Sequence, residues 1–167
     1  TSISMEIQNQ NMGVDTVAAY TYVSDLSFES SGNYSVDIFA NASVGDTTIN
    51  EYFALVAGKT ASRWVGRSFD GNFGISGDPG AVSYDQPFLI ADSTLFTDNF
   101  HDQASYIFGN EDISFNKPIE VRIRSKRDDL AIYRRKNGVV WEELPSITIE
   151  DEIFTLSEKA GYFKLGI

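Results

Sequence analysis

The sequence predicts an all-β protein, a two-sheet antiparallel β-sandwich of the immunoglobulin-like or jelly-roll kind. Three observations predict it: apolar residues recur at every second position in several short segments, Gly, Asn and Asp turns separate the segments, and no long segment shows a helical apolar repeat. Strands with one apolar face bury that face against a second sheet. We expect one domain over residues 1–167, with residues 1–13 as an exchangeable N-terminal strand and its tether.

Four segments show the alternation most clearly. They cover residues 3–7, 34–40, 119–123 and 163–167. Residues 52–57 are apolar at every position, which is typical of a central strand covered on both faces. Less regular strands are expected over residues 17–28, 63–65, 87–91, 105–108, 130–133, 139–144 and 147–156. Residues 92–101 form a short helix at most.

Asn137 and Gly138 stand between two of the expected strands. Both residue types tolerate the positive φ of a type I′ turn, so the sequence predicts a tight hairpin here. Tyr133 and Trp141, one on each side of the turn, are expected to pack as a cross-strand pair.

Charge is unevenly distributed along the chain, whose formal net charge is −11. Residues 1–115 contain 15 acidic and 3 basic side chains, whereas residues 116–167 contain 9 acidic and 10 basic ones. The acidic excess argues against nucleic acid and anionic lipid as partners, and no apolar stretch is long enough for membrane insertion.

The basic side chains concentrate in residues 122–136, which include Arg122, Arg124, Arg134 and Arg135. One interpretation is a solvated face that pairs with acidic side chains of its own domain. The other is an interface that docks onto the acidic face of a neighbouring copy.

Four motifs in the last third of the chain follow the pattern of a known group of domains. They are Phe115-Asn116-Lys117-Pro118, Asp129-Leu130-Ala131-Ile132-Tyr133, Trp141-Glu142-Glu143-Leu144 and Gly161-Tyr162-Phe163-Lys164-Leu165. In this order they resemble the closing strands of the immunoglobulin-like and ZU5-like sandwich modules of bacterial and archaeal secreted surface proteins. The resemblance implies an extracellular, non-enzymatic module, and residues 1–114 resemble no family.

Cysteine and histidine, two residue types that often take part in catalysis, are absent or scarce, so we expect no enzyme and assign no catalytic residue. The chain has no cysteine, and His101 is its one histidine, set in an acidic stretch without a nucleophile motif. Calcium is the one cofactor indicated, because Asp70, Asn72, Asp78 and Asp85 offer oxygen ligands within a glycine-rich stretch. The alternative for these four is an acidic loop stabilised by Asx turns.

Aromatic side chains indicate a second kind of partner. Trp64, Trp141 and several tyrosines would suit the apolar faces of sugar rings if they were exposed, although most aromatic residues of a β-rich protein lie in its core. Asn33 and Asn41 each begin an N-x-[ST] sequence and are acceptors for glycosylation if the source glycosylates secreted chains.

The N-terminal residues predict self-assembly. Ile3, Met5 and Ile7 alternate with polar residues, and the polar segment 8–13 links them to the rest of the chain. A strand on such a tether can complete the sheet of the next subunit and so form a homopolymer. The alternative is an ordinary first strand that pairs within its own domain.

The expected function is therefore that of a non-catalytic extracellular structural or adhesive surface protein, a subunit of a filament such as a pilus or of a surface layer, joined by strand donation. A carbohydrate-binding module accessory to a secreted hydrolase is the alternative. The first residue is Thr1 rather than methionine, as expected of a surface protein whose leader has been removed.

Overall fold

The computed structural model describes residues 2–7, 10–12, 15–18, 21–23, 31–42, 45–92 and 105–167. All regular secondary structure within these residues is β-strand, and the described residues contain no helix. Two antiparallel sheets pack together, which confirms the predicted all-β sandwich. A separate two-stranded sheet pairs β3 (Asp15–Ala18) with β4 (Thr21–Val23). The described residues contain no helix of the length and apolarity that crossing a membrane requires.

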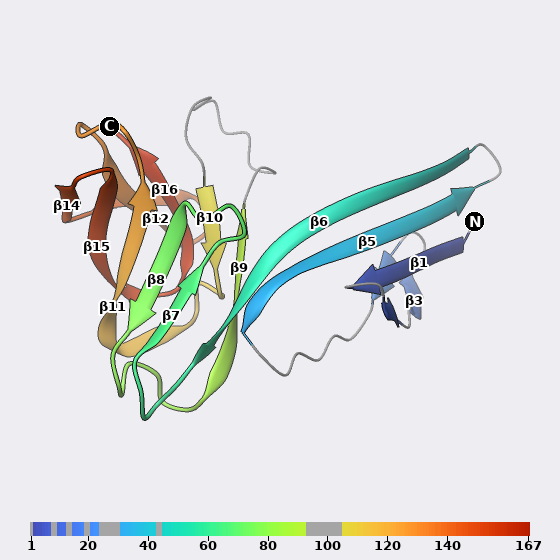
Figure 1. Cartoon of the computed structure of the whole chain (residues 1–167), viewed down its shortest axis with the longest axis horizontal. Helices are drawn as coiled ribbons and strands as arrows, with labels where there is room; N and C mark the ends of the chain where they lie inside the picture. Colours follow the sequence, from blue (N-terminus) through green and yellow to red (C-terminus); the bar gives the residue numbers. More distant parts are fainter. Residues whose placement is uncertain are drawn as a thin grey trace.

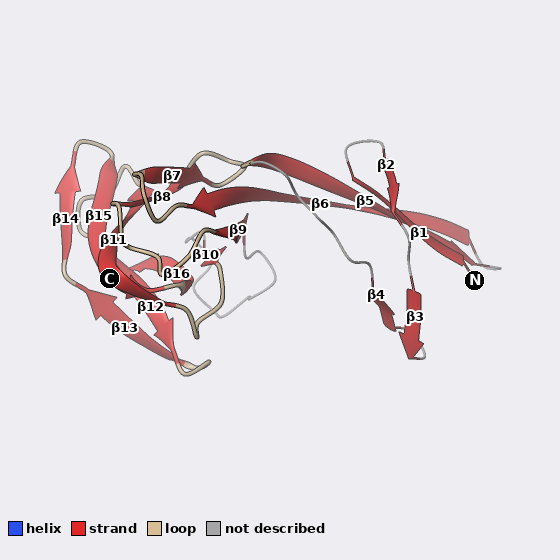
Figure 2. Cartoon of the chain, turned by 90° about the horizontal axis from the view of Figure 1, so that it is seen from below, coloured by secondary structure: helices blue, strands red, loops and turns tan. Residues whose placement is uncertain are grey.

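The larger sheet has nine strands among the described residues. In hydrogen-bonding order they are β13 (Val140–Leu144), β12 (Ala131–Lys136), β16 (Gly161–Gly166), β10 (Ser105–Phe108), β9 (Gln86–Asp92), β6 (Gly45–Gly58), β5 (Gly32–Ala42), β1 (Ser2–Ile7) and β2 (Gln10–Met12). The smaller sheet has the order β14 (Ser146–Ile149), β15 (Glu152–Lys159), β11 (Ser114–Arg124), β8 (Phe73–Gly77) and β7 (Trp64–Arg67). Figures 1 and 2 show that the smaller sheet faces the β13-to-β6 part of the larger one.

The core lies between the two sheets and is rich in aromatic rings. Alternate residues of β11 and β15 point inward and are buried, as the period-two pattern predicts. Trp64, Phe88, Phe108 and Phe115 form one cluster, with ring centroids 5.6 Å apart for Trp64 and Phe88 and 5.1 Å apart for Phe88 and Phe108. The cluster joins strands of both sheets and so fastens the sandwich.

Strand β8 lies where the sequence predicted an acidic, glycine-rich loop, so that prediction is wrong for residues 73–77. All five residues of β8 are buried, and the strand lies between β11 and β7. A Cβ atom on Gly77 would lie 2.8 Å from Nε1 of Trp64, and one on Gly74 would lie 2.9 Å from Cγ of Arg122. The two glycines therefore let large side chains lie flat against the strand, and they hide its apolar alternation.

The hairpin predicted at Asn137 and Gly138 is confirmed. The two residues have φ values of 53° and 78° between β12 and β13. Because Lys136 pairs with Val140, the loop consists of residues 137–139, one residue more than in a two-residue type I′ hairpin.

The cross-strand pair predicted for Tyr133 and Trp141 is wrong. The register places Tyr133 opposite Glu143 and Trp141 opposite Arg135. The hydroxyl of Tyr133 bonds to Glu143 Oε2 at 3.1 Å. Trp141 is therefore two positions from the residue opposite Tyr133, and the two rings stand diagonally rather than directly opposite.

The strand predicted over residues 147–156 is a hairpin of two strands, β14 and β15. The chain turns at Glu150, whose φ is 57°, and Ile147 then pairs with Phe154. Before it, Pro145 separates β13 from β14, where the chain passes from the larger sheet to the smaller one. Proline has no backbone N–H to donate, and none is needed at this position because the β12–β13 and β14–β15 hydrogen-bond ladders both end next to it.

Strand β6 is central in its sheet but is not covered on both faces, so that prediction is wrong. Ala54 and Val56 are buried, Leu55 and Ala57 are half-buried, and Tyr52 is 49% exposed. The strand is interior because it pairs with β5 and β9, yet only one of its faces lies on the core.

Half of β6 extends beyond the sandwich. Strand β9 pairs with residues 53–58 of β6, whereas β5 pairs with it from Gly45 to Leu55. We call β1, β2, β5 and residues 45–52 of β6 the arm, which runs away from the two packed sheets in Figure 1. Residues 10–12, expected as part of a polar tether, form β2 and pair with β1.

Candidate functional site

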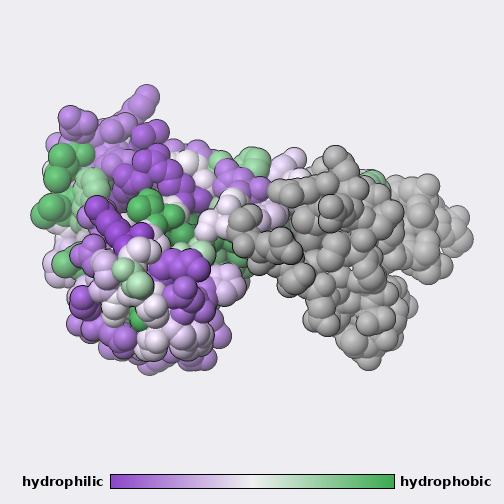
Figure 3. Space-filling model, turned by 60° about the horizontal axis from the view of Figure 1, so that its bottom comes forward, coloured by the Kyte–Doolittle hydropathy of each residue, from purple (hydrophilic) through white to green (hydrophobic). Residues whose placement is uncertain are grey.

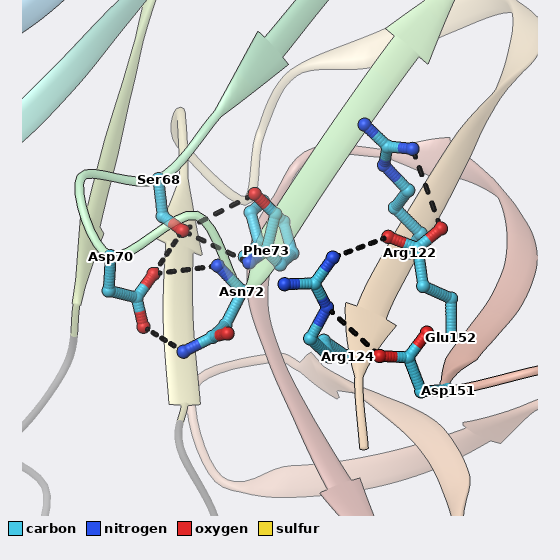
Figure 4. Close-up of polar contacts among 8 residues, drawn as sticks. All are labelled: Ser68, Asp70, Asn72, Phe73, Arg122, Arg124, Asp151 and Glu152. Atoms are coloured by element: carbon cyan, nitrogen blue, oxygen red, sulfur yellow. Dashed lines mark hydrogen bonds and ion pairs between the residues drawn. The ribbon is translucent and has the colours of Figure 1, made fainter. Parts of the chain in front are cut away.

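The turn between β7 and β8 contains a carboxylate that accepts four hydrogen bonds. Asp70 accepts them from the Ser68 hydroxyl, from the backbone N–H (3.0 Å) and the side-chain amide (2.9 Å) of Asn72, and from the Tyr106 hydroxyl (2.9 Å); Figure 4 shows those from Ser68 and Asn72. Burial acts to raise the pKa of Asp70, but the hydrogen bonds outweigh it and lower that pKa. Since Tyr106 belongs to the larger sheet, Asp70 ties the turn to the opposite layer.

The four predicted calcium ligands do not come together in one group. Asp70 and Asn72 precede β8, whereas Asp78 follows it. Asp85 accepts hydrogen bonds from the N–H (2.8 Å) and the hydroxyl (3.0 Å) of Thr60 and from the ammonium of Lys59. These hydrogen bonds lower the pKa of Asp85. In the part of the chain that the structure describes, no three His, Asp or Glu residues are grouped to hold a metal ion.

Two of the four predicted interface arginines lie on β11, on the outer face of the smaller sheet. Arg122 contacts Glu152 at 3.5 Å, and Arg124 contacts Asp151 at 3.5 Å and Glu152 at 3.9 Å (Figure 4). The acidic partners come from β15 and from the turn that precedes it. This pair of arginines is therefore already matched within the chain.

The other two lie on β12, in the larger sheet, so the four do not share one face. Arg134 contacts Glu142 at 3.0 Å, and Nε of Arg135 contacts Glu111 at 2.6 Å. The guanidinium of Arg135 also lies 3.4 Å from the ring centroid of Tyr162, a cation–π contact. The contacts agree with the interpretation of a basic stretch that pairs with acidic side chains of its own domain.

The two tryptophans do not share a sugar-binding surface. Trp64 is 4% exposed, within the aromatic cluster, and Trp141 is half-buried with Nζ of Lys164 at 4.2 Å from its ring centroid. An exposed aromatic pair lies at another place: Tyr52 of β6 and Phe69 of the β7–β8 turn have ring centroids 4.8 Å apart and are 49% and 50% exposed. Sequence reasoning did not single out this pair, because the two residues come from different sheets.

An apolar strip covers the outer face of the β14–β15 hairpin. Ile147, Ile149 and Leu156 are exposed by 63%, 55% and 64%, and Phe154 is half-buried beside them. We call these four residues the β14–β15 strip. Three of them, Ile147, Phe154 and Leu156, border an open groove of about 440 Å³ together with Pro145. Figure 3 shows hydrophobic surface on the side where Figure 1 places β14. A contiguous exposed apolar surface of this kind is typical of an interaction site.

The sequence itself contains a signal for this strip. Ile147 and Ile149 occupy odd positions, whereas Phe154 and Leu156 occupy even ones. Along one regular strand, the residues that face outward are either all odd-numbered or all even-numbered. The change from odd to even positions therefore indicates a turn, and the acidic residues 150–152 between the two pairs mark it.

The predicted self-assembly residues Ile3, Met5 and Ile7 belong to β1, which pairs with β5 of the same chain. Their register partners are Ala40, Ile38 and Val36. This is the arrangement of the alternative, a first strand paired within its own domain.

The two glycosylation acceptors both lie in β5. Asn33 is exposed, and Asn41 pairs with Ser2. His101 and most of the short helix expected at residues 92–101 lie outside the described residues.

No protein-family model matches this chain, and no curated protein matches it significantly. The resemblance of the last third to immunoglobulin-like and ZU5-like modules therefore stays a prediction.

Proposed function

We propose that this chain is a non-catalytic structural or adhesive protein of the cell surface, and that β1 of one copy pairs with β5 of the next to build a filament or surface layer. The observation that carries the proposal is the position of β1: within the described residues it pairs only with strands of the arm and with no strand of the sandwich. Releasing β1 therefore leaves the two packed sheets and their core unchanged.

The pairing of β1 with β5 transfers to a neighbouring chain without a change of register. The ladder runs from Ser2 opposite Asn41 to Ile7 opposite Val36. Its backbone hydrogen bonds are the same whether the two strands belong to one chain or to two, which makes strand exchange a low-cost route to assembly. Each copy donates one strand and accepts another, so the assembly grows head to tail.

The charge of the arm gives this assembly a distinctive salt dependence. The strands of the arm contain four acidic side chains, those of Glu6, Asp37, Asp46 and Glu51, and no lysine or arginine. Arms of two copies repel each other at low ionic strength, and added salt screens that repulsion over a Debye length of about 8 Å at physiological strength. Assembly through the arm is therefore expected to strengthen as salt is added, whereas assembly through ion pairs would weaken.

The test compares two sets of substitutions in β1. Replacing Ile3, Met5 and Ile7 by serine, or deleting residues 1–8, is expected to leave a monomer in light scattering and no filaments in negative-stain microscopy. Replacing Ser2 and Ser4 by threonine alters the other face of the same strand and is expected to preserve assembly. A wild-type chain that is monomeric at every concentration and salt would refute the proposal, as would a serine variant that assembles equally well.

A carbohydrate-binding role is the second candidate, and the exposed pair of Tyr52 and Phe69 favours it. Half-exposed rings offer faces on which a pyranose can stack. Retention of the monomeric chain on an insoluble polysaccharide, lost in Phe69→Ser and kept in Tyr84→Ser, would support this role. Tyr84 is the matched control because it is a 65% exposed aromatic residue outside the pair.

A further inference from the structure

The β14–β15 strip lies at an open edge of the smaller sheet. Strand β14 pairs with β15 on one side, and no other described strand pairs with it. Natural edge strands are usually protected by lysine, by an inward charge or by a covering element, because their free N–H and C=O groups accept a further strand. Residues Ser146–Ile149 carry no charge, and Ile147 and Ile149 are more than half exposed. This edge is therefore suited to strand addition.

Three carboxylates without a basic partner lie next to the strip. Glu120 stands opposite Leu156 in the ladder of β11 and β15, and its described contact is a 3.4 Å hydrogen bond from Ser76. Glu150 follows the last residue of β14, and Glu158 follows Leu156 by two positions. None of these three glutamates forms an ion pair with a described residue, whereas Glu152 is held by two arginines. These arginines, Arg122 and Arg124, lie on the same face as the strip but are matched by Glu152 and Asp151. The three unpaired glutamates therefore leave the rim of the strip acidic.

The acidic rim determines which segment fits. Residues 1–58, which include the donor strand β1, contain no lysine or arginine, so the arm of another copy would bring further carboxylates to this rim. Charge complementarity instead favours an occupant with basic residues at its ends and apolar residues at alternate positions between them. Such a segment adds backbone hydrogen bonds along β14 and lays its apolar side chains on the strip.

We propose that the β14–β15 strip binds an extended segment of another protein, with alternating apolar residues flanked by lysine or arginine, by strand addition to β14. This goes beyond the self-assembly proposed above and does not depend on it, because the arm and the smaller sheet share no paired strand.

Fluorescence anisotropy with a labelled peptide KKITITIKK and its acidic counterpart EEITITIEE tests this on the full chain. The basic peptide is expected to bind at least about tenfold more tightly at low salt, and added salt is expected to reduce the difference. Ile147→Ser is expected to weaken its binding about tenfold, because one isoleucine side chain loses its burial. Val65→Ser is the matched control: Val65 is 55% exposed on β7, the other edge of the same sheet.

Charge reversal at the rim tests whether Glu120 acts on the peptide directly, because a substitution that only perturbed the fold would not reverse the preference between the two peptides. Glu120→Lys is expected to weaken binding of the basic peptide and to strengthen binding of the acidic one. Failure of the basic peptide to bind, equal binding of the two peptides, or an equal effect of Val65→Ser would overturn the proposal. The proposal would also be overturned if Ile147→Ser reduced the molecular mass that light scattering measures for the protein without peptide, since the occupant of the strip would then be a second copy. The serine variant of β1 is expected to bind the peptide unchanged, which separates this test from that of self-assembly.

Discussion

Substituting Gly77 by alanine is expected to destabilise the sandwich strongly although it adds one methyl group. The new Cβ would lie 2.8 Å from Nε1 of Trp64 and closer still to Cζ2 and Cε2, whereas carbon atoms in contact stay about 3.5–4.0 Å apart. Trp64 is 4% exposed, and its ring centroid lies 5.6 Å from that of Phe88 and 6.3 Å from that of Phe115. The indole therefore has no free space into which it can move.

The expected cost follows from this geometry. Overpacking a well-filled core costs about 1–3 kcal/mol, and a displaced indole belongs near the upper end of that range. Gly77 has no positive φ, so alanine fits the backbone and removes unfolded-state entropy, which offsets about 0.4–1 kcal/mol. We expect a net loss of about 2 kcal/mol, which corresponds to a fall in Tm of about 4–8 °C for a chain of this size.

Urea unfolding followed by circular dichroism measures this loss, with Gly74→Ala as the matched control on the same strand. The atoms above Gly74 belong to the flexible side chain of Arg122, which can swing outward, so a loss below about 1 kcal/mol is expected there. In a Trp64→Phe background the cost of Gly77→Ala should also fall by at least about 1 kcal/mol. Equal losses for the two glycines, or an unchanged cost beside Phe, would refute the reasoning.

Three further substitutions test individual side chains. Glu111→Gln leaves the Arg135 guanidinium, which lies 2.6 Å from Glu111, without its carboxylate, and we expect urea unfolding to show a loss of about 1–3 kcal/mol; a loss below about 0.5 kcal/mol would contradict this. Partial desolvation, and then the charge of Asp70, raise the pKa of the exposed Asp92 carboxyl above its ordinary value of 3.8. Ionised Asp92 therefore opposes folding at a pH above that raised pKa. Asp92→Asn should therefore raise Tm at pH 7 and lose this effect below pH 3.8, and a rise that persists in acid would count against it. Leu156→Thr, at a 64% exposed position, should change the free energy of unfolding by less than about 0.5 kcal/mol, and a loss of several kcal/mol would show that this side chain is buried.

The strands that the sequence predicted best are those whose burial is decided by alternation alone. Residues 119–123 are the clearest case: Ile119, Val121 and Ile123 are buried in β11, while Glu120 and Arg122 between them reach the outer face. The alternation is local, so the sequence shows it without knowledge of the partner strand.

Strand β8 shows where that reasoning stops. Gly74 and Gly77 carry no apolar signal, and their reason for being glycine lies in Arg122 and Trp64, which other strands bring over them. The same holds for the ion pairs. Glu111 contacts Arg135 because the segment after β10 lies beside β12, and the sequence gives no sign of this contact across a separation of 24 residues.

The sequence by itself determined that this protein is all-β, where most of its strands run, and that its first strand alternates apolar and polar residues. Only the tertiary structure decided that the four arginines are matched within the chain, that β1 lies on an arm outside the sandwich, and that Ile147, Ile149 and Leu156 stay exposed. The physical reason is that alternation states which side chains share a face, whereas what covers a face depends on strands that pair and pack across long sequence separations.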